Sequence, residues 1–160
     1  MAHGINELGT IVGWAAAPEG VRYAAAWYED GPICLGGLGG LDNRAYSINE
    51  LGQIVGYAVA PDNGRTHAML FDPTGDGNNI DLNLVTDLAE GWFLETALCI
   101  NDNGWIVGWG TQPGTTMKGA FLLRPEQDVE PVPLPGAALL GVLGLGYAGM
   151  RLRRTTPAEG

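Results

Sequence analysis

The chain has 160 residues, a length that suggests one domain with an appendage. Glycine contributes 26 residues and proline 10, while charged residues make up only 16%, a composition that favours β-strands joined by tight turns over helices. The formal net charge of −10 repels phosphate backbones, so nucleic acid is excluded as an expected partner.

A ten-residue motif occurs three times along the chain. Each copy begins with Ile-Asn, has glycine at its fifth position and ends with Ile-Val-Gly followed by an aromatic residue. The copies are Ile5–Trp14, Ile48–Tyr57 and Ile100–Trp109. Their offsets of 43 and 52 residues are typical of propeller blades and comparable repeat arrays.

The first half of each motif predicts a hairpin turn. Asparagine at the first turn position and glycine at the fourth suit a type I turn followed by a bulge, and asparagine can bond the backbone two residues on. We therefore expect six turn residues to be structural rather than ligand contacts. They are Asn6 and Gly9, Asn49 and Gly52, and Asn101 and Gly104.

Further strands are expected after each motif. Short apolar runs that follow polar turns are predicted to be strands. These runs are Tyr23–Tyr28, Thr66–Phe71 and Lys118–Leu123. A later strand is expected over residues 33–38 and again over residues 79–84. In the second of these, alternation would place Ile80, Leu82 and Leu84 on one face.

The predicted fold class is all-β. We expect a repeat array of four-stranded antiparallel units that resembles part of a β-propeller, followed by a C-terminal transmembrane helix. The units span about residues 2–43, 44–96 and 97–125. Because a propeller typically needs four to eight blades, an open array with a poorly covered edge strand is expected. Met1 falls within a strand of the first unit, which gives the expectation that the chain is the C-terminal part of a longer gene product.

The repeat resembles the HAF-type repeat of bacterial extracellular proteins. The resemblance rests on the ten-residue motif, on Ala-x-Leu-aromatic as in Ala68–Phe71, and on the run Leu35–Gly40. It covers about residues 2–125 and weakens in the third copy, where Lys118–Phe121 leads directly into the tail. It implies an extracellular repeat protein without an assigned reaction.

No catalytic set of residues emerges, so neither enzymatic activity nor a cofactor is expected. Neither His3 nor His67 has a second histidine at a metal-ligand spacing, and with one serine a nucleophile elbow is absent. The nearest approach to a metal site is the loop Asp72–Asp81. Asp72 and Asp76 match the start of a calcium loop, but the bidentate glutamate at its twelfth position is absent. A plain turn is therefore favoured over a metal site.

The cysteines and the motif aromatics allow further expectations. Cys34 and Cys99 occupy non-equivalent positions in the repeat, so two buried free thiols are expected rather than a disulfide. Trp14, Tyr57 and Trp109 occupy equivalent positions, which leaves two interpretations open. They could form an exposed ring that binds glycan, or they could pack between blades.

The C-terminal residues predict a membrane-directed tail. Residues 126–135 are rich in proline and acidic residues and indicate an extended linker. Residues 136–150 carry no charge and are predicted to be the transmembrane segment, and residues 151–160 form a basic cytoplasmic tail. The predicted membrane-stop residues are Arg151, Arg153 and Arg154.

The order of these tail features resembles the VPLPA and PEP-CTERM sorting signals. The motif residues are Val132, Pro133, Leu134 and Pro135. The resemblance implies recognition by an exosortase-like membrane transpeptidase, removal of the tail, and a host that makes exopolysaccharide or biofilm matrix. We therefore expect an exported surface or matrix protein with a structural or adhesive role and transient inner-membrane anchoring. Two alternatives stay open: a module that binds glycan or calcium, and a fragment of an extracellular enzyme.

Overall fold

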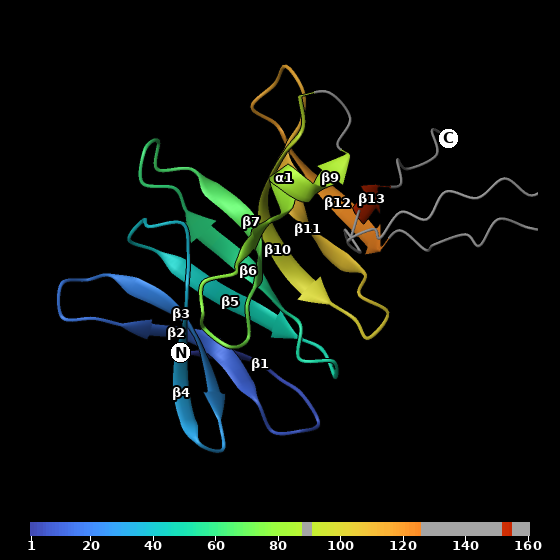
Figure 1. Cartoon of the computed structure of the whole chain (residues 1–160). Coiled ribbons are helices and arrows are strands. Elements are labelled where there is room, and N and C mark those ends of the chain that lie inside the picture. Colours follow the sequence, from blue (N-terminus) through green and yellow to red (C-terminus); the bar gives the residue numbers. More distant parts are fainter. Residues whose placement is uncertain (88–90, 126–151, 155–160) are drawn as a thin grey trace, which may run out of the picture.

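The structure is a computed structural model that describes residues 1–87, 91–125 and 152–154. The described residues are mostly β-strands, arranged in three sheets that follow one another in chain order (Figure 1), and their one helix is four residues long. The prediction of an all-β protein is therefore confirmed.

Each sheet is built largely from one repeat. The first has the order β1-β2-β3-β4 and the second the order β5-β6-β7-β8, with all neighbours antiparallel. The strands of the first are β1 (Ala2–Ile5), β2 (Ile11–Ala16), β3 (Arg22–Tyr28) and β4 (Gly31–Gly36). Those of the second are β5 (Asn43–Ile48), β6 (Ile54–Val59), β7 (Thr66–Phe71) and β8 (Ile80–Asp81).

The third sheet has the order β10-β11-β12-β13-β9. Its strands are β10 (Phe93–Ile100), β11 (Ile106–Thr111), β12 (Lys118–Pro125), β13 (Leu152–Arg154) and β9 (Thr86–Asp87). β13 is antiparallel to β12 and parallel to β9. The sequence did not predict a strand at 152–154, which here stands in the place of the fourth strand of this repeat.

The third element of the second repeat differs from the expectation. A strand was predicted through residue 84, but β8 ends at Asp81 and the helix α1 (Leu82–Val85) follows it directly. The side chain of Asp81 accepts a hydrogen bond from the backbone N–H of Asn83 and so caps the helix. Leu82 is buried whereas Leu84 is 83% exposed, so the predicted shared face is wrong.

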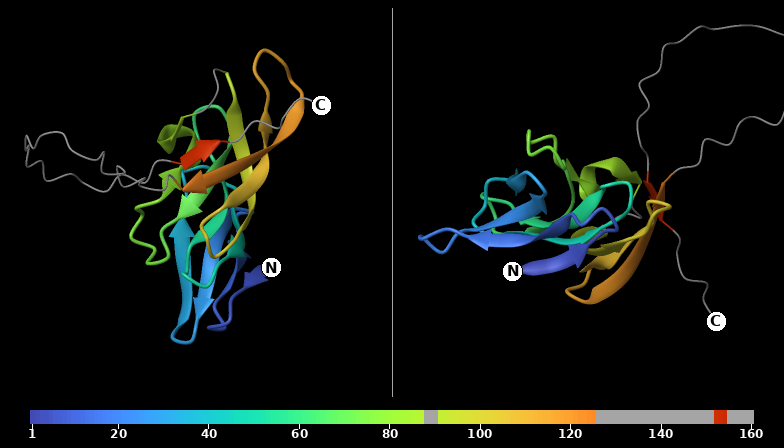
Figure 2. Two further views of the ribbon diagram at one scale, coloured as in Figure 1. Left: turned by 90° about the vertical axis from the view of Figure 1, so that its right-hand side faces the viewer. Right: turned by 90° about the horizontal axis from the view of Figure 1, so that it is seen from below.

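Two apolar clusters lie between the three sheets. Val12 and Leu35 of the first sheet pack with Ile54 and Phe71 of the second. A second cluster joins the other face of the second sheet to the third, with α1 at its edge. Its members are Val55, Ala68, Leu82, Leu94, Ala97, Ile100, Ile106, Phe121 and Leu123. The second sheet is therefore covered on both faces, which Figure 2 shows as a middle layer between its neighbours.

A bulge recurs in the first strand of every repeat and explains the motif glycine. The register of β5 against β6 shifts between Ala45 and Ser47, and the other two repeats shift at the matching place. The bulge brings the Arg44 carbonyl oxygen so close to Gly56 that an added Cβ would lie 1.9 Å from it. The equivalent glycines, Gly13 and Gly108, would have a Cβ 2.0 Å from a carbonyl oxygen. The motif requires glycine here because only a residue without a side chain allows this approach.

Candidate functional site

The three predicted turns are present and stack on one another. In each, the glycine N–H donates to the asparagine carbonyl three residues earlier, at 3.0, 3.1 and 2.9 Å. Gly9, Gly52 and Gly104 have φ values of +77°, +76° and +73°, the left-handed conformation that the bulged turn needs. The asparagine Oδ1 accepts backbone N–H groups within its own turn in every copy.

Each asparagine amide also reaches the next repeat. Asn6 Nδ2 donates to the carbonyl of Asn49 at 3.3 Å, and Asn49 Nδ2 donates to the carbonyl of Asn101 at 3.0 Å. Asn6 and Asn49 are buried, at 7% and 4% exposure. The motif asparagines therefore join successive repeats as well as closing their own turns, a role that the sequence did not indicate.

The acidic residue after each asparagine makes a second link, in which the earlier repeat is again the donor. The backbone N–H of Glu7 donates to both carboxylate oxygens of Glu50, at 2.9 and 3.0 Å. The N–H of Glu50 donates to Asp102 Oδ1 at 2.9 Å. We call these contacts, together with the asparagine contacts, the turn ladder. Its polar groups hold repeats together, which is a structural use of residues that would otherwise be ligand candidates.

The motif aromatics lie against cations. The guanidinium of Arg44 lies over Trp14 and over Tyr57, at 5.3 and 5.7 Å from the ring centroids, and Lys118 lies 5.1 Å from Trp109. Tyr57 is only 8% exposed, and its burial, followed by the nearby Asp42 carboxylate, raises the pKa of its phenol. The contact of Arg44 with Trp14 joins two repeats, and Tyr57 is buried, so these two positions favour packing over an exposed glycan-binding ring, whereas the Lys118–Trp109 contact lies within the third sheet.

The loop Asp72–Asp81 folds around its first carboxylate. Asp72 accepts hydrogen bonds from the backbone N–H and hydroxyl of Thr74 and from the backbone and side-chain N–H groups of Asn78. The bonds from Thr74 come first among the causes that lower the pKa of Asp72. Within the parts of the chain that the structure describes, no group of three or more His, Cys, Asp or Glu side chains is arranged to hold a metal.

We expect calcium to leave the stability of the protein unchanged. The Asp72 carboxylate already has four donors, and the Asp76 side chain accepts no hydrogen bond that would orient it toward Asp72. The measurement is the melting temperature of the full chain with calcium and with a chelator. A rise in calcium that disappears in Asp76→Ala would contradict the expectation, and Asp62→Ala, an exposed acid in another turn, is the matched control.

Among the described residues, the histidines and cysteines do not belong to a cluster of three or more possible metal ligands. His67 Nδ1 lies 2.6 Å from Asp81 Oδ2, and its ring packs edge-on against Phe93 at 4.8 Å. Cys34 and Cys99 are free, but both are exposed, so the expectation that they are buried is wrong. Cys34 lies on β4 of the first sheet, and Cys99 lies on β10 of the third, where its Sγ is 3.8 Å from the Ser47 hydroxyl of the second sheet.

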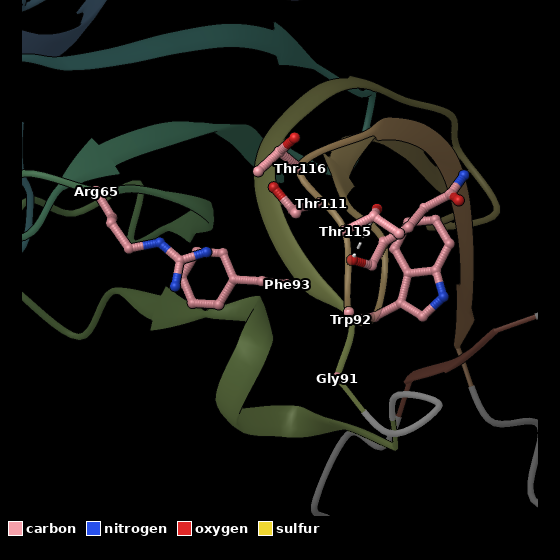
Figure 3. Close-up of a pocket in the computed structure, with 9 residues that line it drawn as sticks. Arg65, Gly91, Trp92, Phe93, Thr111, Thr115 and Thr116 are labelled. Atoms are coloured by element: carbon pink, nitrogen blue, oxygen red, sulfur yellow. Dashed lines mark hydrogen bonds between the residues drawn. The ribbon is translucent and has the colours of Figure 1, made fainter.

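An open groove of about 610 Å³ lies between the second and third sheets. In Figure 3, Arg65 and Phe93 stand on one side and Trp92 with Thr115 on the other. The Arg65 guanidinium lies 3.6 Å from the centroid of the Phe93 ring. Trp92 lies close over Gly119, because a Cβ added there would be 2.7 Å from its Cη2 atom. Two aromatic surfaces are thus held beside hydroxyl and amide groups.

A charged network borders the groove. Glu95, which is 8% exposed, accepts hydrogen bonds from Lys118 Nζ and from the hydroxyl of Thr111. Burial alone would raise the pKa of Glu95, but the bonds from Lys118 and Thr111 outweigh it and hold the pKa below its usual value. The Glu95 carboxylate therefore stays ionised and bonded to Lys118 and Thr111, and its role is to hold these two residues in place beside the groove.

The sorting motif Val132–Pro135, the transmembrane segment at 136–150 and Arg151 lie outside the described residues. Arg153 and Arg154 belong to β13, where their backbone pairs with Arg124 and Leu123 of β12. Over residues 1–87, 91–125 and 152–154, no helix has the length and apolar character needed to cross a membrane.

The chain matches no protein-family model, no curated protein and no solved structure.

Proposed function

We propose that this chain is an exported surface or matrix repeat protein with a structural or adhesive role, sorted by its C-terminal tail. The observation that carries the proposal is the order of features in residues 132–154: a Val-Pro-Leu-Pro motif, an uncharged run and an arginine cluster. The turn ladder supports a scaffold role, because the recurring polar residues bind neighbouring repeats and leave no reactive set in the described residues.

Membrane insertion would change the third sheet. If residues 136–150 cross the inner membrane with the repeats outside, Leu152–Arg154 lie on the opposite side from β12 and cannot pair with it. The β12–β13 pairing then belongs to the chain before insertion. The prolines of the motif keep the segment beside the membrane extended, because each removes a donor and biases the residue before it away from helix.

The double variant Pro133→Ala/Pro135→Ala should still insert but should no longer be processed. An extended segment exposes its peptide bonds to a membrane transpeptidase, whereas a helix hides them. The measurement is membrane fractionation with mass spectrometry of the mature C-terminus in a host that has an exosortase. The control is Pro18→Ala/Pro113→Ala, which changes two exposed prolines in turns of the repeats.

Two outcomes would contradict the proposal. If the unmodified mature protein still ends at Gly160, the tail is a plain anchor and not a sorting signal. If the triple variant Arg151→Glu/Arg153→Glu/Arg154→Glu leaves the orientation of the chain in the membrane unchanged, the arginine cluster does not act as a membrane stop.

A second function, carbohydrate binding, is favoured by the groove. Sugar rings stack on aromatic faces and hydrogen-bond to hydroxyl and amide groups, and the partly buried Trp92 lines the groove beside Gln112, Thr115 and Thr116. The groove is open along its length, which suits a glycan chain better than a small enclosed ligand.

Trp92→Ala should weaken binding of a matrix polysaccharide by about tenfold, the factor that corresponds to the loss of one stacking contact of ~1.4 kcal/mol. Calorimetric titration of the full chain with polysaccharide fragments measures the effect. Trp105→Ala, which removes a 39%-exposed indole outside the groove, is the matched control. Equal loss in both variants, or no binding by the unmodified chain, would exclude the groove as a glycan site.

A further inference from the structure

The face that each repeat turns toward the preceding repeat is covered in two repeats and open in the first. The first isoleucine of the motif lies on this face. Ile48 and Ile100 are 8% and 5% exposed, because each packs on the sheet before it, whereas the equivalent Ile5 is 65% exposed. The first sheet therefore presents an apolar face built to the same pattern as two buried faces.

On the opposite face of each sheet, the exposed residue is found in the last repeat instead of the first. The motif valine lies on the face that each repeat turns toward the following repeat. Val12 and Val55 are both 0% exposed, whereas Val107 in the last repeat is 43% exposed. Cys99 pairs with Val107 across β10 and β11 and shares this face. The third sheet thus presents the face that would receive a further repeat.

The turn ladder has complementary ends. By equivalence with the inner repeats, Asn101 Nδ2 and the backbone N–H of Asp102 would donate to a following turn, and the Glu7 carboxylate would accept from a preceding one. Among the described residues none of these three groups has a hydrogen-bond partner. The donors stand at one end of the array and the acceptor at the other.

We propose that two copies of the chain join head to tail and close a ring of six sheets. The third sheet of each copy packs on the first sheet of the other through the contacts that already join repeats within one chain. Such a head-to-tail interface must close on itself or grow into a filament. Closed rings of this kind typically have four to eight sheets, and two copies of the described residues, with three sheets each, fall within that range.

The inner junctions specify the new contacts. Asn101 Nδ2 donates to the Asn6 carbonyl of the partner, and the Asp102 N–H donates to the Glu7 carboxylate of the partner. Ser47 Oγ and Cys99 Sγ are 3.8 Å apart at the inner junction of the second and third repeats. Gly4, Ser47 and Cys99 occupy the same position in the first, second and third repeats, opposite the motif valine. In the ring, Cys99 of one copy therefore lies beside Gly4 of the other.

Oxidative cross-linking tests this geometry on the full chain in detergent. Each variant carries Cys34→Ser, so that Cys99 is the sole native thiol. With diamide as the oxidant, Gly4→Cys should give a disulfide-linked dimer with no free thiol. Ser47→Cys is the matched control and should give a monomer with an internal disulfide, which shows that this pair of positions can be bridged. Adding Val107→Asp should abolish the dimer of Gly4→Cys, whereas Leu84→Asp, an exposed leucine on α1, should not.

The detergent-corrected mass of the unmodified chain is the second measurement. Twice the chain mass, reduced to the chain mass by Val107→Asp, supports the ring. An unmodified chain that is monomeric at micromolar concentrations overturns the ring. So does a Gly4→Cys variant that forms no disulfide-linked dimer under the conditions in which Ser47→Cys is fully oxidised. A series of cross-linked species larger than the dimer also overturns it, because it indicates an open filament. Neither readout depends on processing of the tail.

Discussion

Replacing Asn49 with alanine is expected to lower the free energy of unfolding by about 3 kcal/mol, because it removes four hydrogen bonds made by a buried side chain. Its Oδ1 accepts the N–H groups of Leu51 and Gln53, at 3.1 and 2.9 Å. Its Nδ2 donates to Gln53 Oε1 and to the carbonyl of Asn101, at 2.7 and 3.0 Å. The variant thus opens one turn and one junction between repeats together.

The three motif asparagines form a matched series. The Asn6 side chain has one acceptor bond in its own turn and one donor bond to the next repeat, whereas the Asn101 side chain, among the described residues, bonds only within its own exposed turn. In the Val107→Asp background, which removes the proposed contact of Asn101 with a second copy, the loss of stability should therefore fall in the order Asn49, Asn6, Asn101, with Asn101→Ala costing about 1 kcal/mol. Urea unfolding followed by tryptophan fluorescence gives the three values. Equal losses at all three positions would mean that the asparagines serve their own turns and not the junctions.

Gly56→Ala should destabilise the protein by about 3 kcal/mol or more, because the added methyl group must displace backbone and not a flexible side chain. Its Cβ would lie 1.9 Å from the Arg44 carbonyl oxygen and 2.9 Å from the Ala45 Cα atom. The second sheet is covered on both faces, so the bulge has no free side toward which it can relax.

Gly64→Ala is the control for Gly56→Ala. Gly64 has a φ of +66°, but a Cβ added there would meet no atom within 4 Å, so the cost is conformational strain of about 1 kcal/mol. Urea unfolding of the two variants under one condition separates steric conflict from strain. A larger loss for Gly64→Ala would show that the bulge can move aside and that the close approach does not explain the motif glycine.

The hairpins and most strands could be predicted from the sequence because their signals are local. A turn needs only Asn and Gly at fixed spacing, and Asn49–Gly52 satisfies that within four residues. The turn ladder could not be predicted in this way, because its bonds join residues 43 and 52 positions apart. One signal was available: an acidic residue follows the asparagine in every copy, as Glu7, Glu50 and Asp102.

The features that the sequence predicted wrongly, or did not predict, depend on contacts with neighbouring residues or sheets. Alternation over residues 79–84 fits a strand, but the capping bond of Asp81 to Asn83 starts a helix. Cysteine is usually buried, and Cys99 would be so if another sheet lay on the third one. The groove was missed because Arg65 lies beside the second sheet and Phe93 in the third, and the two meet only when those sheets pack together.

The turn ladder has a consequence for how such a protein can evolve. Its two bridging bonds use the same residues at each junction, although the spacing between copies changes from 43 to 52 residues, with α1 and β9 lying in the longer connection. Gene duplication or deletion of one whole unit therefore preserves every junction contact, whereas a change at Asn or at the following acid damages two units together. The same few positions therefore form every junction, whereas the connections between them are free to lengthen.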